Sequence, residues 1–265
     1  MRRLIIAAYL ASLSAATAHD FWLEPEKFNA ALGEPLSVAF TIGHAGEHEP
    51  WNLRSEKIAD FRSCSQNGCT IESDIVADTP EKRGRALVVM KTEGTAILAF
   101  ESRPSLSELE GEKFTDYAMK EGLAAIIADR AARGTEATPG REFYSRRAKT
   151  LVRVGGGDPD DVSRPVGHTL EIAPLKNPYA LKAGEALPVR VLFKGEPLEG
   201  ATIDLDDLSD TRDPVQSAKT DAGGVATFTA DGPGPWKVMT IWGVPLDDRR
   251  RADYETFFAS LTFGG

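Results

Sequence analysis

The sequence LPVRVLFKGEPLEGATIDL, residues 187–205, carries the pattern that decides the fold class. Apolar and polar residues alternate over residues 187–193, which is typical of a half-buried β-strand. Turn residues occupy 195–197, and a second alternating run follows at 201–205. Similar runs recur along the rest of the C-terminal hundred residues. The pattern therefore predicts a β-sandwich domain over residues 166–265.

The N-terminal half of the chain has the same character. Short runs rich in β-branched and aromatic residues occur at 36–42, 85–90 and 95–100, and turn residues separate them. We expect a first β-sandwich domain over residues 19–154. The sequence as a whole predicts a mostly β protein with two β-sandwich domains.

Residues 155–165 are the predicted linker between the two domains. They begin with Gly155, Gly156 and Gly157 and continue with a run of Asp and Pro. The glycines are not typical of a phosphate-binding loop, because no Lys-Ser or Lys-Thr pair ends the run and no apolar helix follows it. A flexible connection fits this composition best.

A helical insertion is predicted in the first domain, over about residues 105–134. Glu, Lys and Ala dominate there, and the apolar residues recur with a period close to 3.6. We expect two short helices that are broken near Gly122, with Ser105 or Ser107 capping the first and Gly134 ending the second.

Cys64 and Cys69 are the only two cysteines. They flank Asn67-Gly68, a pair that favours the centre of a tight hairpin turn. In an oxidising compartment, an even number of cysteines across a hairpin predicts a disulfide bond.

The first 18 residues are typical of a secretory signal peptide. Arg2 and Arg3 precede an apolar run from Leu4 to Leu13, and small residues stand at Ala16 and Ala18. The apolar run is too short to span a bilayer. We therefore expect export to the periplasm, cleavage after Ala18 and a mature chain that does not span the membrane. The formal net charge of −9 argues against nucleic acid as a partner.

Cleavage after Ala18 would leave a histidine, His19, at the amino terminus. A terminal histidine offers its α-amine and its ring Nδ1 to one metal ion, and such nitrogen donors suit Ni, Co, Zn and Cu. His44 and His48 follow a predicted strand and are the other candidate metal ligands, with Glu47 and Glu49 beside them. An unordered first residue and a solvated loop with incidental histidines are the alternatives.

Other patterns indicate structure rather than chemistry. His168 fits a structural or surface residue. The acidic run that contains Asp204 and Asp206 lacks the order of a calcium-binding loop, and we expect a solvated strand end there. The sequence contains no G-x-S-x-G nucleophile elbow and no zinc-protease helix, so no residue is predicted to be catalytic.

Several phrases of the sequence resemble a bacterial exported family of unknown function that is associated with nickel uptake or cobalt transport in the periplasm. The phrases are His19–Pro25 (HDFWLEP), Gly43-His44, Tyr144–Gly155 (YSRRAKTLVRVG), Asn177–Leu181 and Ala259–Phe263. The resemblance implies an accessory protein that binds a divalent transition metal, with His19 and His44 at matching positions. The C-terminal half is also similar in outline to transthyretin-like and carboxypeptidase-regulatory-like modules, which are usually binding or spacing domains.

Three functions follow as expectations. The first is a non-enzymatic protein that binds nickel or cobalt, with zinc or copper as alternatives, and assists uptake through a membrane importer or an outer-membrane receptor. The second is an oxidative enzyme, because a terminal histidine with a second histidine resembles the copper-binding histidine brace. The third is an interaction module without a metal.

Overall fold

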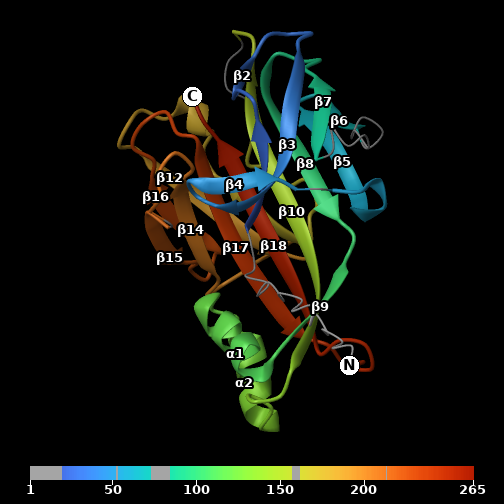
Figure 1. Ribbon diagram of the computed structural model, residues 1–265. Coiled ribbons are helices and arrows are strands. Elements are labelled where there is room, and N and C mark those ends of the chain that lie inside the picture. The colour runs from blue at the N-terminus through green and yellow to red at the C-terminus, as the bar shows by residue number, and fades with distance from the viewer. Residues whose placement is uncertain (1–19, 52, 73–83, 157–161, 213) are drawn as a thin grey trace, which may run out of the picture.

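The computed structural model describes residues 20–51, 53–72, 84–156, 162–212 and 214–265, and it is mostly β, as predicted (Figure 1). The strands of the first half are β1 (Asp20–Pro25), β2 (Asn29–Ala30), β3 (Pro35–His44), β4 (Glu47–Pro50), β5 (Ile58–Ser65), β6 (Gly68–Ile71), β7 (Arg85–Val89), β8 (Gly94–Ser102), β9 (Ser105–Leu109) and β10 (Gly140–Val154). Those of the second half are β11 (Leu170–Pro174), β12 (Ala186–Phe193), β13 (Glu196–Pro197), β14 (Thr202–Asp207), β15 (Gln216–Lys219), β16 (Val225–Thr229), β17 (Trp236–Pro245) and β18 (Tyr254–Phe263). The helices are α1 (Gly111–Lys120) and α2 (Ala124–Arg133), with short 3-10 turns at Ser55–Lys57 and Pro178–Ala180.

A ten-stranded sheet forms the centre of the molecule. Its order is β15-β14-β17-β18-β10-β8-β5-β6, and β2 and β9 also pair with β10. Strands β10 and β18 run parallel, from Glu142 opposite Tyr254 to Thr150 opposite Thr262. Strands from both sides of the predicted linker therefore share one sheet. Residues 157–161 of that linker lie outside the described residues, and the division into two domains stays a prediction.

The two faces of the central sheet enter different hydrophobic cores, because successive side chains of a strand point to opposite faces. On one face, Leu151, Leu261 and Val238 pack against the sheet formed by β11, β12, β13 and β16. On the opposite face, Val152 and Leu98 pack against the sheet formed by β1, β3, β4 and β7. The fold is thus of the sandwich type, with smaller sheets on both sides of the central one.

The two helices cover the end of the central sheet that lies lowest in Figure 1. Phe114 and Ile126 are fully buried and pack with Phe258 of β18. The break near Gly122 and the end at Gly134 are confirmed, and both glycines have a positive φ. No helix in the described ranges is long and apolar enough to cross a membrane.

The predicted start of the helical segment was wrong. Residues Ser105–Leu109 form β9, which pairs antiparallel with β10, and α1 begins only at Gly111. Ser105 and Ser107 are therefore ladder residues and do not cap the helix. Their partners in β10 run from Gly140, opposite Leu109, to Tyr144, opposite Ser105. A local capping pattern does not reveal hydrogen bonds to so distant a segment.

The predicted disulfide bond is confirmed. Cys64 and Cys69 are bonded, and they face each other in the β5–β6 ladder. The bond closes a hairpin whose turn contains Asn67, as the sequence predicts.

Candidate functional site at the start of strand β1

Two of the candidate metal ligands, His44 and His48, lie in the β3–β4 hairpin beside the first residues of β1, but they do not share one face. His19 lies outside the described residues, which begin at Asp20. Asp20 pairs with Gly43 of β3, and the β3–β4 hairpin pairs Gly43 with His48 and His44 with Glu47. Because paired residues share a face and neighbours along a strand do not, His44 and His48 point to opposite faces of the hairpin.

The His48 imidazole is held by residues of β1. Its Nε2 lies 3.3 Å from Oε1 of Glu24, whose Oε2 accepts a hydrogen bond from the Thr41 hydroxyl at 3.0 Å. The ring also packs edge-on against the Trp22 indole, with 5.2 Å between the ring centroids. A carboxylate acceptor of this kind orients an imidazole.

Gly43 allows this close approach of the two strands. A Cβ atom at Gly43 would lie 2.4 Å from the Glu47 carbonyl oxygen and 2.6 Å from Cα of His48, and the φ of +141° also favours glycine. A side chain at this position would displace His48 from Trp22.

His44 is half-buried on the face whose side chains continue into the core between the sheets. The turn that follows it packs against the loop after β14. A Cβ atom at Gly46 would lie only 3.1 Å from the carbonyl oxygen of Asp210 and from Cγ2 of Thr211. Packing against this loop holds the turn beside His44 in place.

A buried group of charges lies next to the hairpin, and we call Asp20, Lys237, Asp206 and Trp22 the Lys237 cluster. The Lys237 ammonium contacts the Asp20 carboxylate and lies 3.0 Å from Oδ2 of Asp206. It also lies 4.8 Å from the centroid of the Trp22 ring, within the range of a cation–π interaction. Lys237, Asp206 and Trp22 have no exposed surface, and Asp20 is 7% exposed.

The two carboxylates keep Lys237 charged. Burial alone lowers the pKa of Lys237, but the charges of Asp20 and Asp206 outweigh it, so the pKa lies above its usual value. The expectation of a solvated strand end was therefore wrong for Asp206. Its pairing with Lys237 across β14 and β17 removes it from water. Lys237, between the apolar residues Trp236 and Val238, was the one sequence signal of this cluster.

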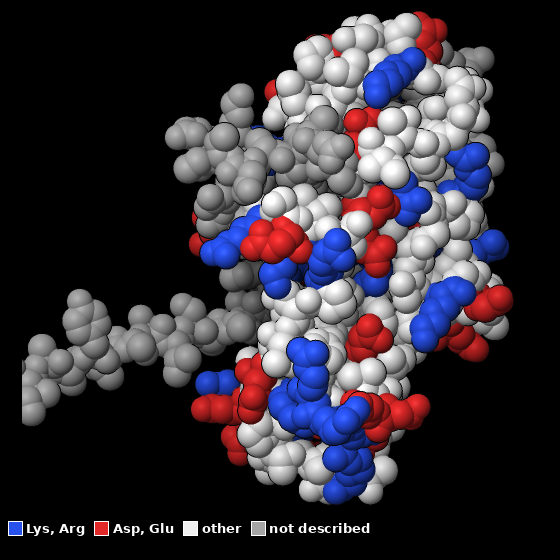
Figure 2. All heavy atoms as spheres, turned by 90° about the vertical axis from the view of Figure 1, so that its right-hand side faces the viewer, with Lys and Arg blue, Asp and Glu red and all other residues white. Residues whose placement is uncertain are grey.

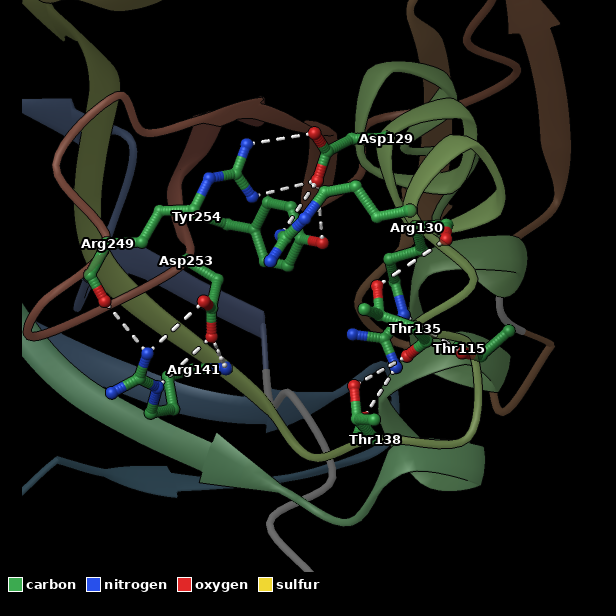
Figure 3. Close-up of polar contacts among 10 residues, drawn as sticks. Thr115, Asp129, Arg130, Thr135, Thr138, Arg141, Arg249, Asp253 and Tyr254 are labelled. Atoms are coloured by element: carbon green, nitrogen blue, oxygen red, sulfur yellow. Dashed lines mark hydrogen bonds and ion pairs between the residues drawn. The ribbon is translucent and has the colours of Figure 1, made fainter.

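A second polar network ties the helices to the β17–β18 loop at the other end of the molecule (Figure 3). Asp129 of α2 receives two hydrogen bonds from Arg249, at 2.8 and 2.9 Å, and one from the Tyr254 hydroxyl at 3.0 Å. The hydrogen bond from Arg249 is the main reason that the pKa of Asp129 lies below its usual value. Arg141 joins the same loop through Asp253.

Lys and Arg gather over this end of the molecule in Figure 2. Arg141 and Arg249 have the acidic partners described above. Arg250 of the same loop pairs with Asp248. Buried Arg130 donates to backbone carbonyl oxygens, including that of Thr138 at 2.7 Å. Such pairings stabilise the contact between the helices and the β17–β18 loop.

His168 is a buried structural residue, as one of the two predictions had it. It is 4% exposed, and burial lowers its pKa well below the usual value, aided by the nearby positive charges of Lys149 and Arg147. Glu171 accepts hydrogen bonds from Lys149 Nζ at 2.8 Å and from the His168 backbone N–H at 3.1 Å. The ring is thus kept neutral beside a buried ion pair.

Glu142 is a buried carboxyl group between β10 and α1. It accepts a hydrogen bond from the Thr256 hydroxyl at 2.8 Å and is 5% exposed. Burial raises its pKa to about 7, against the opposing effects of the Thr256 and Tyr117 hydroxyls and the Arg146 charge. Sequence reasoning gave no signal for this group.

Among the described residues, no group of three or more His, Cys, Asp and Glu side chains lies together in a way that could hold a metal ion. A cavity of about 510 Å³ lies elsewhere, between Arg153, Tyr179, Trp236 and Phe263.

A family profile described as a domain of unknown function (DUF4198) matches residues 16–243. No curated protein matches the sequence. The D0-D1 domain of intimin is 12% identical, with a TM-score of 0.22, over 92% of this chain and 97% of that chain. Dimeric latent PorU from Porphyromonas gingivalis is 10% identical, with a TM-score of 0.20, over 92% of this chain and 20% of that chain.

Proposed function

Since the chain belongs to the DUF4198 family of domains of unknown function, its residues must suggest a function, and we propose that it binds a divalent transition metal ion through His19 and His44. The proposed cargo is nickel or cobalt, with zinc or copper as alternatives. The proposed setting is the periplasm, after removal of residues 1–18, where the protein passes its metal to a membrane importer or an outer-membrane receptor.

The pairing of Asp20 with Gly43 carries this proposal. His19 directly precedes Asp20 in the chain, and His44 directly follows Gly43. A free His19 would contribute its α-amine and ring nitrogen, and the His44 imidazole would contribute a third nitrogen. Three nitrogen donors suit nickel, cobalt, zinc and copper and disfavour magnesium and calcium.

The hairpin register favours His44 over His48 as the partner of His19. His48 points to the opposite face from His44, where it contacts Glu24 and Trp22. In this proposal His48 stabilises the hairpin and leaves the metal to the other two histidines.

Calorimetric titration with NiCl₂ tests the proposal. The reference is protein that begins at His19, and the two variants carry one added alanine before His19 or His44→Ala. The extension turns the α-amine of His19 into a peptide nitrogen, and His44→Ala removes an imidazole. We therefore expect the affinity to fall more than about tenfold, equivalent to more than about 1.4 kcal/mol. The matched control is His48→Gln, which we expect to bind nickel within about twofold of the reference, a difference of less than about 0.5 kcal/mol. Unchanged affinity after the alanine extension would refute the terminal chelate.

The same nitrogen donors would also serve copper chemistry, and one assay separates an enzyme from a carrier. The copper-loaded protein is mixed with ascorbate, and peroxide consumption is followed. Stoichiometric binding without turnover supports metal carriage. Sustained consumption that His44→Ala abolishes would favour an oxidative enzyme instead.

A further inference from the structure

We propose that the cavity of about 510 Å³ beside Trp236 binds a small organic monoanion, namely a carboxylate carried on an aromatic or other apolar body. Its volume lies within the range of about 300–1,000 Å³ that small-molecule sites occupy. We call it the Trp236 pocket, and its lining includes Arg153, Tyr179, Leu181, Lys182, Trp236 and Phe263. Neither His44 nor His48 lines it, so the inference is independent of the proposed metal site.

The hydrophobic core forms the floor of the Trp236 pocket. The pocket lies where β10 and β18 end and β17 begins, and Leu187 of β12 lines it from the facing sheet. Leu187, Trp236 and Phe263 are buried members of the core between the two sheets, and Tyr179 and Leu181 pack against them. The walls are therefore held by the packed core, and we expect the pocket to exist before a ligand enters.

The aromatic walls present apolar faces, because their polar atoms are already hydrogen-bonded within the protein. The Tyr179 hydroxyl donates to the Leu151 carbonyl oxygen at 2.8 Å. The Trp236 Nε1–H donates to the Gly232 carbonyl oxygen at 3.2 Å. These bonds fix the orientation of both rings, and the surface that remains suits the flat apolar body of a ligand.

The charged side chains of the pocket favour an anion. Arg153 and Lys182 are exposed, and neither side chain forms an ion pair or hydrogen bond with the residues that the structure describes. Arg249 and Arg250, by contrast, each pair with a carboxylate. The lining contains one carboxylate side chain, Glu185, which accepts a hydrogen bond from the Lys182 backbone N–H at 3.3 Å. Two cations and one carboxylate leave a formal charge of +1 on the lining side chains.

The charge of the whole chain limits how negative the ligand is. A guanidinium binds a carboxylate through paired N–H groups, so Arg153 suits such a group at the mouth of the pocket. The formal net charge of −9 disfavours the approach of a polyanion such as a nucleotide. A single negative group on an apolar body satisfies both conditions.

A pair of probes of the same shape tests the proposal by NMR. The ¹⁵N-labelled protein is titrated with 2-naphthylacetate and, separately, with the neutral 2-naphthylacetamide, and the indole N–H resonances are followed. We expect 2-naphthylacetate to shift the Trp236 resonance to saturation and to leave that of Trp22 unchanged, since Trp22 is fully buried against Lys237. The amide should bind about tenfold more weakly, because it lacks the charge that Arg153 recognises.

Two substitutions separate the charge from the apolar walls. Arg153→Gln should lower the affinity for 2-naphthylacetate about tenfold and leave that for the amide unchanged. Ala183→Trp, at an exposed residue of the lining, should fill the pocket and weaken both probes. Where Arg153→Gln does not fold, as thermal unfolding shows, Lys182→Gln tests the charge instead, with an expected loss of about threefold.

Arg103→Gln is the matched control. Arg153 lies opposite Thr95 near one end of β8, whereas exposed Arg103 follows the other end of that strand. The two positions are eight residues apart along β8, or roughly 26 Å, so the control should bind both probes as the wild type does. Equal affinity for the acid and the amide, a Trp236 resonance that does not move, or wild-type affinity in folded Arg153→Gln would each overturn the proposal.

Discussion

Replacing Glu142 by Gln is expected to make the protein more stable above pH 7 and to flatten its stability between pH 5 and pH 7. Glu142 is buried between β10 and α1, and burial raises its pKa from 4.5 to about 7. As the pH rises, the unfolded chain therefore releases this proton first, near pH 4.5, while the folded protein keeps it until about pH 7. Folding stability contributed by the protonated group is complete below the unfolded pKa and is lost as the pH rises through the folded pKa.

The size of the effect follows from the pKa difference. Each unit of pKa corresponds to 1.36 kcal/mol, so a rise from 4.5 to about 7 costs the folded state about 3 kcal/mol at pH 8. Glutamine has no charge to bury, and its amide oxygen can still accept the hydrogen bond from Thr256. We expect Glu142→Gln to gain up to about 3 kcal/mol at pH 8 and close to nothing at pH 4.5.

Urea unfolding of both proteins at half-unit steps from pH 4.5 to pH 8 measures this difference directly. The control is Glu199→Gln, which neutralises an exposed carboxylate in a turn and should follow the wild-type curve. A stability difference between Glu142→Gln and wild type that stays constant with pH would refute the reasoning. It would mean that the folded protein ionises Glu142 as readily as the unfolded chain does.

Two other substitutions test local features. Replacing both Cys64 and Cys69 by Ser opens the loop of the β5–β6 hairpin, and the chain-entropy model predicts a loss of about 2 kcal/mol in urea unfolding; no loss would show that the hairpin is equally constrained in the unfolded chain. Gly43→Ala forces a Cβ atom into the Glu47 carbonyl oxygen and the His48 backbone, and we expect a loss of about 2 kcal/mol or more in thermal unfolding. In NMR spectra of the same variant, the His48 ring resonances should shift as the ring leaves Trp22. The control is Gly68→Ala, at a glycine with open space around it, which should leave these resonances unchanged.

The central sheet shows how distant parts of the chain combine around the candidate site. Strand β10 takes β18 as a parallel neighbour on one side and β8 as an antiparallel neighbour on the other. Strand β1 then packs across β10 and β18, so that the first described residue meets a lysine from the second half of the chain. The first described residue of β1 therefore lies against the central sheet.

Local patterns in the sequence determined the mostly β character, the two helices and the disulfide-closed hairpin. Each of these depends on neighbours a few residues apart: the alternation within a strand, the 3.6-residue period up to Gly134, and the turn between Cys64 and Cys69. The sequence also singled out His19, His44 and His48 as residues of interest, because their donor chemistry needs no structure to be recognised.

Only the tertiary structure decided which of these residues share a face and which charges are buried. His44 and His48 separate because the hairpin register, set by backbone pairing, places them on opposite sides. Asp206 fits a solvated strand end until β14 pairs it with Lys237 of β17, which Asp20 contacts from another sheet. Ser105–Leu109 becomes a strand because β10 offers it a partner. In each case the deciding interaction joins segments far apart in the chain, and the local sequence pattern does not predict that contact.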